Sequence, residues 1–156
     1  MINNDILRSV RYMLDISDFK IVDILKLADR QLTREEVAAY LKKEEDEGYA
    51  VLPDELMAHF LDGLVYFKRG KDESRPPQPL ELPVTNNIVL KKLRVAFELK
   101  EEDLHAILAS VDFPVSKPEL SALFRKVGHN NYRECGDQLL RNFLKGLTLR
   151  VRPAQP

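Results

Sequence analysis

An internal repeat constrains the fold of this chain more than any other feature. When the 156-residue sequence is aligned with itself at an offset of 83 residues, residues 3–69 match residues 86–152 without a gap. Roughly 18 of about 68 positions are identical, which exceeds what shared helical composition gives at one register. Asn3-Asn4, for example, falls on Asn86-Asn87. The sequence therefore predicts one structural unit folded twice.

Each copy has the hydrophobic pattern of four helices. Apolar residues recur at helical spacing in four segments, which in the first copy begin near Asn4, Asp18, Thr33 and Pro53. The paired asparagines fit the N-cap of the first helix. The third helix opens with a capping box in both copies, Thr33 with Glu36 and Ser116 with Glu119. The fourth is the most apolar and is expected to be central.

Glycine interrupts this fourth helix at the same place in both copies, Gly63 and Gly146. A glycine inside a helix costs about 1 kcal/mol relative to alanine. Close approach of a neighbouring backbone is the expected compensation.

A proline-rich segment separates the copies, because residues 71–85 contain four prolines among polar and charged residues. The predicted organisation is a first repeat at 1–70, a linker at 71–85, a second repeat at 86–153 and a tail at 154–156. The fold class is all-α. A single unit would bury little surface alone, so we expect the two to pack face to face about an approximate twofold axis. The alternative is two independent units on a string.

Composition is that of a soluble globular protein, with 44% hydrophobic and 31% charged residues and a net charge of −1. The single cysteine, Cys135, excludes an intrachain disulfide and the common zinc modules. No stretch approaches the roughly 20 apolar residues of a membrane span. We expect a cytoplasmic protein that does not bind membranes.

No enzyme, metal or cofactor motif is expected to act. The six glycines fit neither a P-loop nor a dinucleotide fingerprint. Glu102 and His105 have the spacing of a di-iron ligand pair but lack a second copy. The acidic run at 44–47 has Lys43 where a calcium loop needs its first aspartate. Cys135 with His129 as base is a conceivable nucleophile, but a buried structural thiol is the favoured interpretation.

The two halves differ in charge. Residues 1–78 hold 12 basic and 16 acidic side chains, whereas residues 79–156 hold 12 and 9. A basic stripe exists only on the last helix of the second copy, and the turn at 112–115 suits a helix-turn-helix. The residues predicted to contact a nucleic acid or another partner are Lys117, Arg125, Lys126, Arg141, Lys145 and Arg152. A solvated polar face explains them equally.

Two charged pairs recur in both copies and are predicted to be structural. The arginine of the first helix is expected to pair with the aspartate that opens the fourth, Arg11 with Asp54 and Arg94 with Asp137.

Four segments resemble the YehS-like bacterial family of unknown function. They are NNDILRSVRY at 3–12, KRGKDES at 68–74, NNIVLKKLR at 86–94 and YRECGDQ at 132–138. The resemblance covers nearly the whole chain and implies a tandem domain of unknown function. It transfers no catalytic or binding residue.

Three functions remain open from the sequence. A non-enzymatic protein-binding or regulatory module leads, because duplicated helical units readily present surfaces and no residues converge on catalysis. A nucleic-acid-binding protein that uses the second repeat is the alternative. An enzyme whose site follows no known motif is the third.

Overall fold

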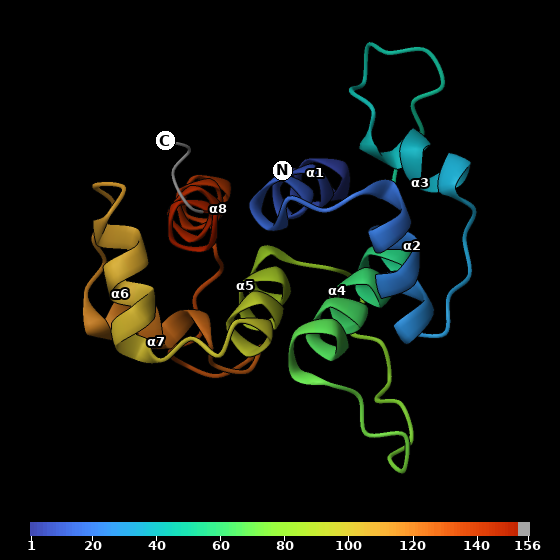
Figure 1. Cartoon of the computed structure of the whole chain (residues 1–156). Coiled ribbons are helices and arrows are strands. Elements are labelled where there is room, and N and C mark those ends of the chain that lie inside the picture. The colour runs from blue at the N-terminus through green and yellow to red at the C-terminus, as the bar shows by residue number, and fades with distance from the viewer. Residues whose placement is uncertain (153–156) are drawn as a thin grey trace.

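The computed structural model describes residues 1–152, which form eight helices and no strand (Figure 1). The first repeat contains α1 (Asn3–Leu14), α2 (Asp18–Leu27), α3 (Arg34–Leu41) and α4 (Asp54–Arg69). The second contains α5 (Asn86–Ala96), α6 (Glu101–Ala109), α7 (Lys117–Leu123) and α8 (Asp137–Val151). The all-helical class and the two four-helix units are confirmed. The tail predicted at 154–156 lies outside the described residues.

Helices α1, α4, α5 and α8 form the centre of the molecule. α4 packs against α5 and α1 packs against α8, so each of these contacts joins one repeat to the other. On the outside, α2 covers α4 and α6 covers α8 (Figure 1). One hydrophobic cluster spans both repeats, and its fully buried members include Val10, Leu61, Leu93 and Leu147. The repeats therefore share a core and are not independent units on a string.

The starts of the central helices meet across the repeats through one aspartate each. Asp54, at the start of α4, accepts a hydrogen bond from the Val84 nitrogen at 3.0 Å, just before α5. Asp137, at the start of α8, accepts one from the Met1 nitrogen at 2.6 Å, just before α1. The two contacts are equivalent at the 83-residue offset.

The ends of the same helices also meet in an equivalent way. Arg69, the last residue of α4, donates to the Val95 carbonyl at 3.1 Å. Arg152, which follows α8, donates to the Tyr12 carbonyl at 2.6 Å. Because starts meet starts and ends meet ends, α4 runs parallel to α5 and α8 runs parallel to α1. The repeated contacts relate the two repeats by approximate twofold symmetry.

The paired asparagines do not cap helices, which corrects the prediction. Ile2 and Thr85 hold the cap positions, and the asparagines are the first two helical residues. Asn4 is fully buried and bonds to main-chain groups of three residues, Tyr40, Ala50 and Leu52. Asn87 makes the three equivalent bonds in the second repeat. These side chains fasten the first helix to the segment between the third and fourth helices.

The two helical glycines lie where a neighbouring backbone approaches. A Cβ atom at Gly63 would lie 2.2 Å from the Ile24 carbonyl oxygen, and one at Gly146 would lie 2.4 Å from the Ile107 carbonyl oxygen. The predicted close approach is confirmed in both repeats.

Both predicted capping boxes are present. The Thr33 hydroxyl accepts from the Glu36 nitrogen at 3.1 Å, and the Glu36 carboxylate accepts from the Thr33 nitrogen at 3.0 Å. Ser116 and Glu119 make the same exchange at 3.2 and 3.4 Å. No helix within residues 1–152 has the length and apolar character that crossing a bilayer requires.

Candidate functional site: the open face of α8 and α1

The chain between α4 and α5 has to return along α4, because the two helices run parallel. α4 has 16 residues and is about 24 Å long. Residues 71–84, which we call the strap, make this return. The Lys71 ammonium anchors its beginning by donating to the Leu27 carbonyl at 2.7 Å. Glu81 anchors its end, with a carboxylate oxygen 2.8 Å from Lys91 Nζ.

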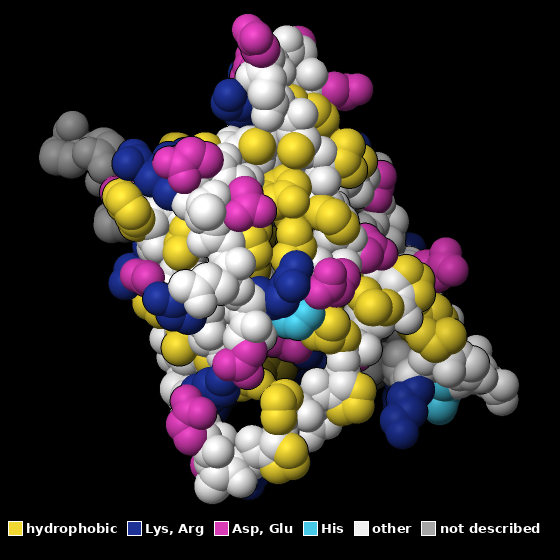
Figure 2. Space-filling view, turned by 90° about the vertical axis from the view of Figure 1, so that its right-hand side faces the viewer, with side chains coloured by type: hydrophobic (Ala, Val, Ile, Leu, Met, Phe, Trp, Pro, Cys, Tyr) yellow, Lys and Arg dark blue, Asp and Glu magenta, His cyan; other side chains and the backbone are white. Residues whose placement is uncertain are grey.

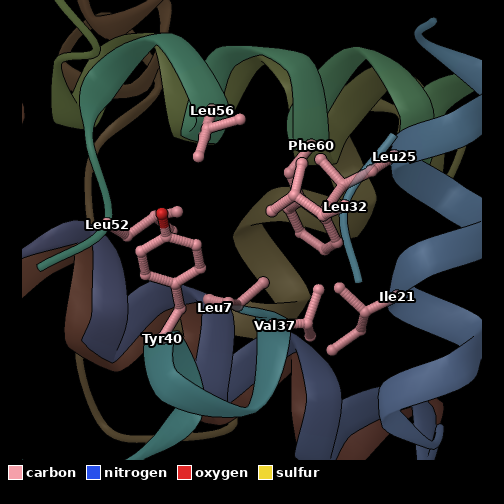
Figure 3. A pocket seen from close by; sticks show the side chains of 9 residues that line it. All are labelled: Leu7, Ile21, Leu25, Leu32, Val37, Tyr40, Leu52, Leu56 and Phe60. Carbon is pink, nitrogen blue, oxygen red and sulfur yellow. The ribbon is translucent and has the colours of Figure 1, made fainter. Parts of the chain in front are cut away.

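The strap covers one surface of the first repeat, which we call the strapped face: His59, Asp62 and Tyr66 of α4 with Lys92 of α5. Leu80 and Pro77 of the strap line a cavity of about 80 Å³ with the three α4 residues. A larger hollow of about 370 Å³ adjoins it beneath the first half of the strap, and Figure 2 shows the strap standing off the body along the lower edge.

Charge on the strapped face is neutralised by close pairs. Lys92 Nζ lies 2.7 Å from an Asp62 carboxylate oxygen, and both side chains are 19% exposed. Glu81 approaches Lys92 at 3.9 Å in addition to Lys91. The ion pair with Lys91 holds the pKa of the Glu81 carboxyl below its usual value.

The twofold symmetry places an equivalent surface on α8 and α1. We call it the open face: Asn142, Lys145 and Leu149 of α8 with Ser9 of α1, at the positions of His59, Asp62, Tyr66 and Lys92. No described segment crosses it; in Figure 1 the strap lies below α4, and the corresponding place beside α8 at the upper edge holds none of residues 1–152. Lys145 is exposed and Leu149 is 62% exposed, whereas the equivalent Asp62 and Tyr66 are half-buried.

The open face has a different charge from the strapped face. Lys145 replaces Asp62 and Ser9 replaces Lys92, so the ion pair of the strapped face has no equivalent. Within residues 1–152, neither Lys145 nor Arg141, one turn earlier on α8, has a carboxylate within 4 Å. Both exposed cations are therefore available to a ligand.

An exposed aromatic ring extends the open face. Tyr12 of α1 is 60% exposed, and the Arg152 guanidinium lies 4.1 Å from the centre of its ring. Leu149 precedes Arg152 by one turn at the end of α8. Two large apolar side chains thus flank a cationic position.

Arg152 has a structural role that the sequence prediction did not assign to it. It bonds to the Tyr12 carbonyl, stacks on the Tyr12 ring and lies 3.4 Å from Asp15. Arg69 binds the end of α5 in the same way, with Glu98 at 3.2 Å. Arg152 joins α8 to α1 and is not a free member of a basic stripe.

The other predicted contact residues are spread over the second repeat. Lys117 begins α7, and Arg125 and Lys126 follow its end; all three are exposed. Arg125 lines a shallow hollow of about 440 Å³ beside α7 with Arg133, whose guanidinium is 2.8 Å from Glu119. α6 ends at Ala109 and α7 begins at Lys117. The connection at 110–116 is longer than the turn of a helix-turn-helix, so that prediction is wrong.

The predicted pairs of arginine and aspartate do not form. Within the described residues, Arg11 has Asp18 as its ion-pair partner at 3.5 Å, and Asp54 accepts from the Asn3 amide at 2.8 Å. Arg11 lies in the last turn of α1, whereas Asn3 and Asp54 lie at the starts of parallel helices. The two groups are therefore at opposite ends of the bundle.

The second repeat departs from the prediction in the same way. Arg94 donates to the Leu99 carbonyl at 3.1 Å and stacks on the Phe124 ring. Asp137 bonds to Met1 and to the Asn86 amide, and these two donors hold the pKa of its carboxyl below the usual value.

Comparison with known proteins identifies the family. The family model described as "Protein of unknown function (DUF1456)" matches the chain twice, at residues 3–70 and 86–152. The chain belongs to this family. "Uncharacterized protein YehS" of Escherichia coli (strain K12) is 52% identical over 150 residues, which are 96% of each chain. No solved structure gives a significant match. The resemblance to YehS proteins is confirmed, and these descriptions name no activity.

The cysteine of this family member lies in the core. Cys135 is 6% exposed, and burial raises the pKa of its thiol to about 11. A nucleophilic cysteine needs the opposite shift. His129, its predicted base, accepts a hydrogen bond from the Asn131 nitrogen at 3.0 Å. Within residues 1–152, no three His, Cys, Asp or Glu side chains gather in a way that could hold a metal ion.

The sequence prediction found the cations of the open face and missed its apolar residues. Leu149 follows Lys145 by four positions and shares its side of α8, which a helical projection shows. Tyr12 belongs to the other repeat, and only the packing of α1 against α8 brings it to this surface.

Proposed function

We propose that this protein is a non-enzymatic binding module that holds an extended segment of a partner protein on its open face. One observation carries the proposal: the equivalent surface of the first repeat is covered by an extended segment, the strap, and the open face has no such cover among the described residues. A surface of the same construction has thus accepted an extended chain once in this molecule.

The chemistry of the open face supports a protein partner. Leu149 and Tyr12 are both about three-fifths exposed, which is unusual for side chains of this size. Apolar side chains beside unpaired cations are typical of protein interfaces, where aromatic and aliphatic groups supply most of the affinity and charge selects the partner. We propose the cytoplasm as the compartment, because the one cysteine is a buried free thiol.

Site-specific crosslinking in the host cell tests the proposal. A photoreactive phenylalanine analogue replaces Leu149 in the full chain, and the matched control carries it at Val127, which is 83% exposed in the segment between α7 and α8. We expect a discrete crosslinked protein from position 149 and not from position 127.

Charge reversal at the same face separates specific binding from accidental contact. Lys145→Glu and Arg141→Glu, each combined with the analogue at 149, should lower the crosslinked product about tenfold, the effect of 1.4 kcal/mol. Equal products from positions 149 and 127, or products that neither reversal changes, would refute the proposal.

Nucleic-acid binding is the second candidate, because five exposed cations remain on the second repeat after Arg152 is set aside: Lys117, Arg125, Lys126, Arg141 and Lys145. Such binding releases counterions, so six or more phosphate contacts should lower affinity about a thousandfold between 50 and 200 mM salt. Fluorescence anisotropy with labelled duplex and single-stranded DNA at both salt concentrations measures this. Weak binding without that slope would eliminate the candidate.

A further inference from the structure

We infer that the partner segment on the open face carries an acidic residue flanked by large apolar residues, as the strap does at Leu80-Glu81-Leu82. The inference rests on the proposed function and specifies its ligand. It is drawn from the contacts of the strap with the strapped face, transferred to the open face by the twofold symmetry of the repeats.

The strap fixes the register of such a segment. Leu80 lies against His59, Asp62 and Tyr66 of α4 in the small cavity. Glu81, the next residue, turns to α5 and bonds to Lys91 Nζ at 2.8 Å. An apolar residue thus packs on α4 while the neighbouring carboxylate meets a cation on the edge of the face.

The open face retains the apolar part of this arrangement. Leu149 has the place of Tyr66, and Tyr12 has the place of Val95, one turn beyond Lys92. Both are more exposed than a residue under the strap, at 62% and 60%. Covering two such side chains stabilises a complex by about 25 cal/mol for each Å² of apolar surface removed from water.

The cation of the open face comes from the other helix. On the strapped face Lys92 of α5 is the inner cation and Asp62 of α4 is its partner, 2.7 Å away. On the open face these positions are Ser9 and Lys145, so the charge moves from the first helix of the pair to the fourth and has no carboxylate within 4 Å among the described residues. A carboxylate in the register of Glu81 would meet Lys145.

A polyanion fits this face less well than a single acidic residue. Arg141 and Lys145 are the two unpaired cations on this side of α8, and Arg152 is bound to Asp15 and Tyr12. A nucleic acid would need a row of cations that track its phosphates. The face instead alternates cationic and apolar positions.

A peptide with the sequence of residues 76–84, PPQPLELPV, tests the inference in trans against the full chain. Labelled peptide is titrated by fluorescence anisotropy, and amide shifts of the protein locate the site by NMR. We expect saturable binding with the largest shifts at 142–149 and around Tyr12. Lys145→Glu should weaken binding about tenfold. A peptide with lysine in place of glutamate should recover most of that loss on the Lys145→Glu protein.

Lys92→Glu is the matched control, because it makes the same charge change on the strapped face. Binding that responds to Lys92→Glu and not to Lys145→Glu would mean that the peptide displaces the strap, and would overturn the inference. Failure of the exchanged charges to restore binding would also overturn it. A polythymidine oligonucleotide that displaces the peptide at 50 mM salt with the slope of counterion release would transfer the face to nucleic acid.

Failure of this inference and failure of the proposed function are distinguishable. A specific crosslink at position 149 that Lys145→Glu abolishes, together with no peptide binding, leaves the binding function and removes the strap-like ligand. Absence of the crosslink removes both.

Discussion

Asn4 joins three segments of the first repeat through one side chain. Its amide nitrogen donates to the Tyr40 and Ala50 carbonyls at 3.0 and 2.8 Å, and its oxygen accepts from the Leu52 nitrogen at 2.9 Å. The residue has no exposed surface. Burial without these partners would leave main-chain groups unsatisfied, each at a cost of about 1–3 kcal/mol.

Asn4→Ala is therefore expected to lower the free energy of unfolding by about 3 kcal/mol. Asn87→Ala removes the same three bonds from the second repeat, where the side chain is only half-buried and water can replace it. We expect a loss of about 1 kcal/mol there. Urea denaturation followed by circular dichroism measures both values, and equal losses would show that burial does not set the cost.

The glycines of α4 and α8 are required by contact and not by backbone conformation. Gly63→Ala would bring its Cβ to 2.2 Å from the Ile24 carbonyl oxygen, so α2 has to move away from α4. We expect Gly63→Ala to cost about 2–3 kcal/mol despite alanine's higher helix propensity. Gln138→Ala, at an exposed helical position of α8, should stay within about 0.5 kcal/mol. A neutral or stabilising Gly63→Ala measured by denaturation would show that the helices separate freely.

Sequence reasoning located the important residues better than it assigned their partners. The 83-residue offset singled out the asparagines, glycines and aspartates that the structure uses in both repeats. It did not show which way a side chain points, so Asn4 was placed at a cap and Asp54 was paired with Arg11. Both errors have one cause: the parallel course of α1 and α4, set by tertiary packing, puts Arg11 about 12 Å along the helix from the aspartate.

The strap is the element that distinguishes the repeats. α4 and α5 are consecutive and parallel, so a connection as long as a helix is unavoidable there, and α8 has no successor among the described residues. The proline-rich composition predicted this linker, but not the surface that it covers. That surface is set by Lys71 and Glu81, whose partners Leu27 and Lys91 lie in different repeats.

Acid is expected to release the end of the strap. The pKa of Glu81 is lowered from 4.5, chiefly by its bond to Lys91, so the carboxylate stabilises the folded strap at pH values above 4.5. This contribution is lost as the pH falls through the lowered pKa. Amide shifts of Leu80 and Leu82 followed by NMR should therefore titrate below pH 4.5, with no such step in Glu81→Gln. An identical titration in Glu81→Gln would assign the change to another group.

At the scale of the whole molecule, the two repeats are bound to each other as closely as to themselves. α4 contacts α5 and α1 contacts α8 over their lengths, with a polar contact at each end. The buried residues of these helices form one cluster. A repeat that unfolded alone would expose the faces of α5 and α8 that it covers.

Unfolding is accordingly expected to be a single cooperative transition that both repeats share. Gly63→Ala should lower the midpoint of thermal unfolding by about 5–10 °C for 2–3 kcal/mol in a chain of this size. Hydrogen exchange read by mass spectrometry should show the same shift for peptides from α2 and from α6, although α6 lies in the other repeat. If the α6 peptides kept their original midpoint while the α2 peptides shifted, the shared core would not couple the repeats, and the symmetry that defines the open face would describe two separate domains.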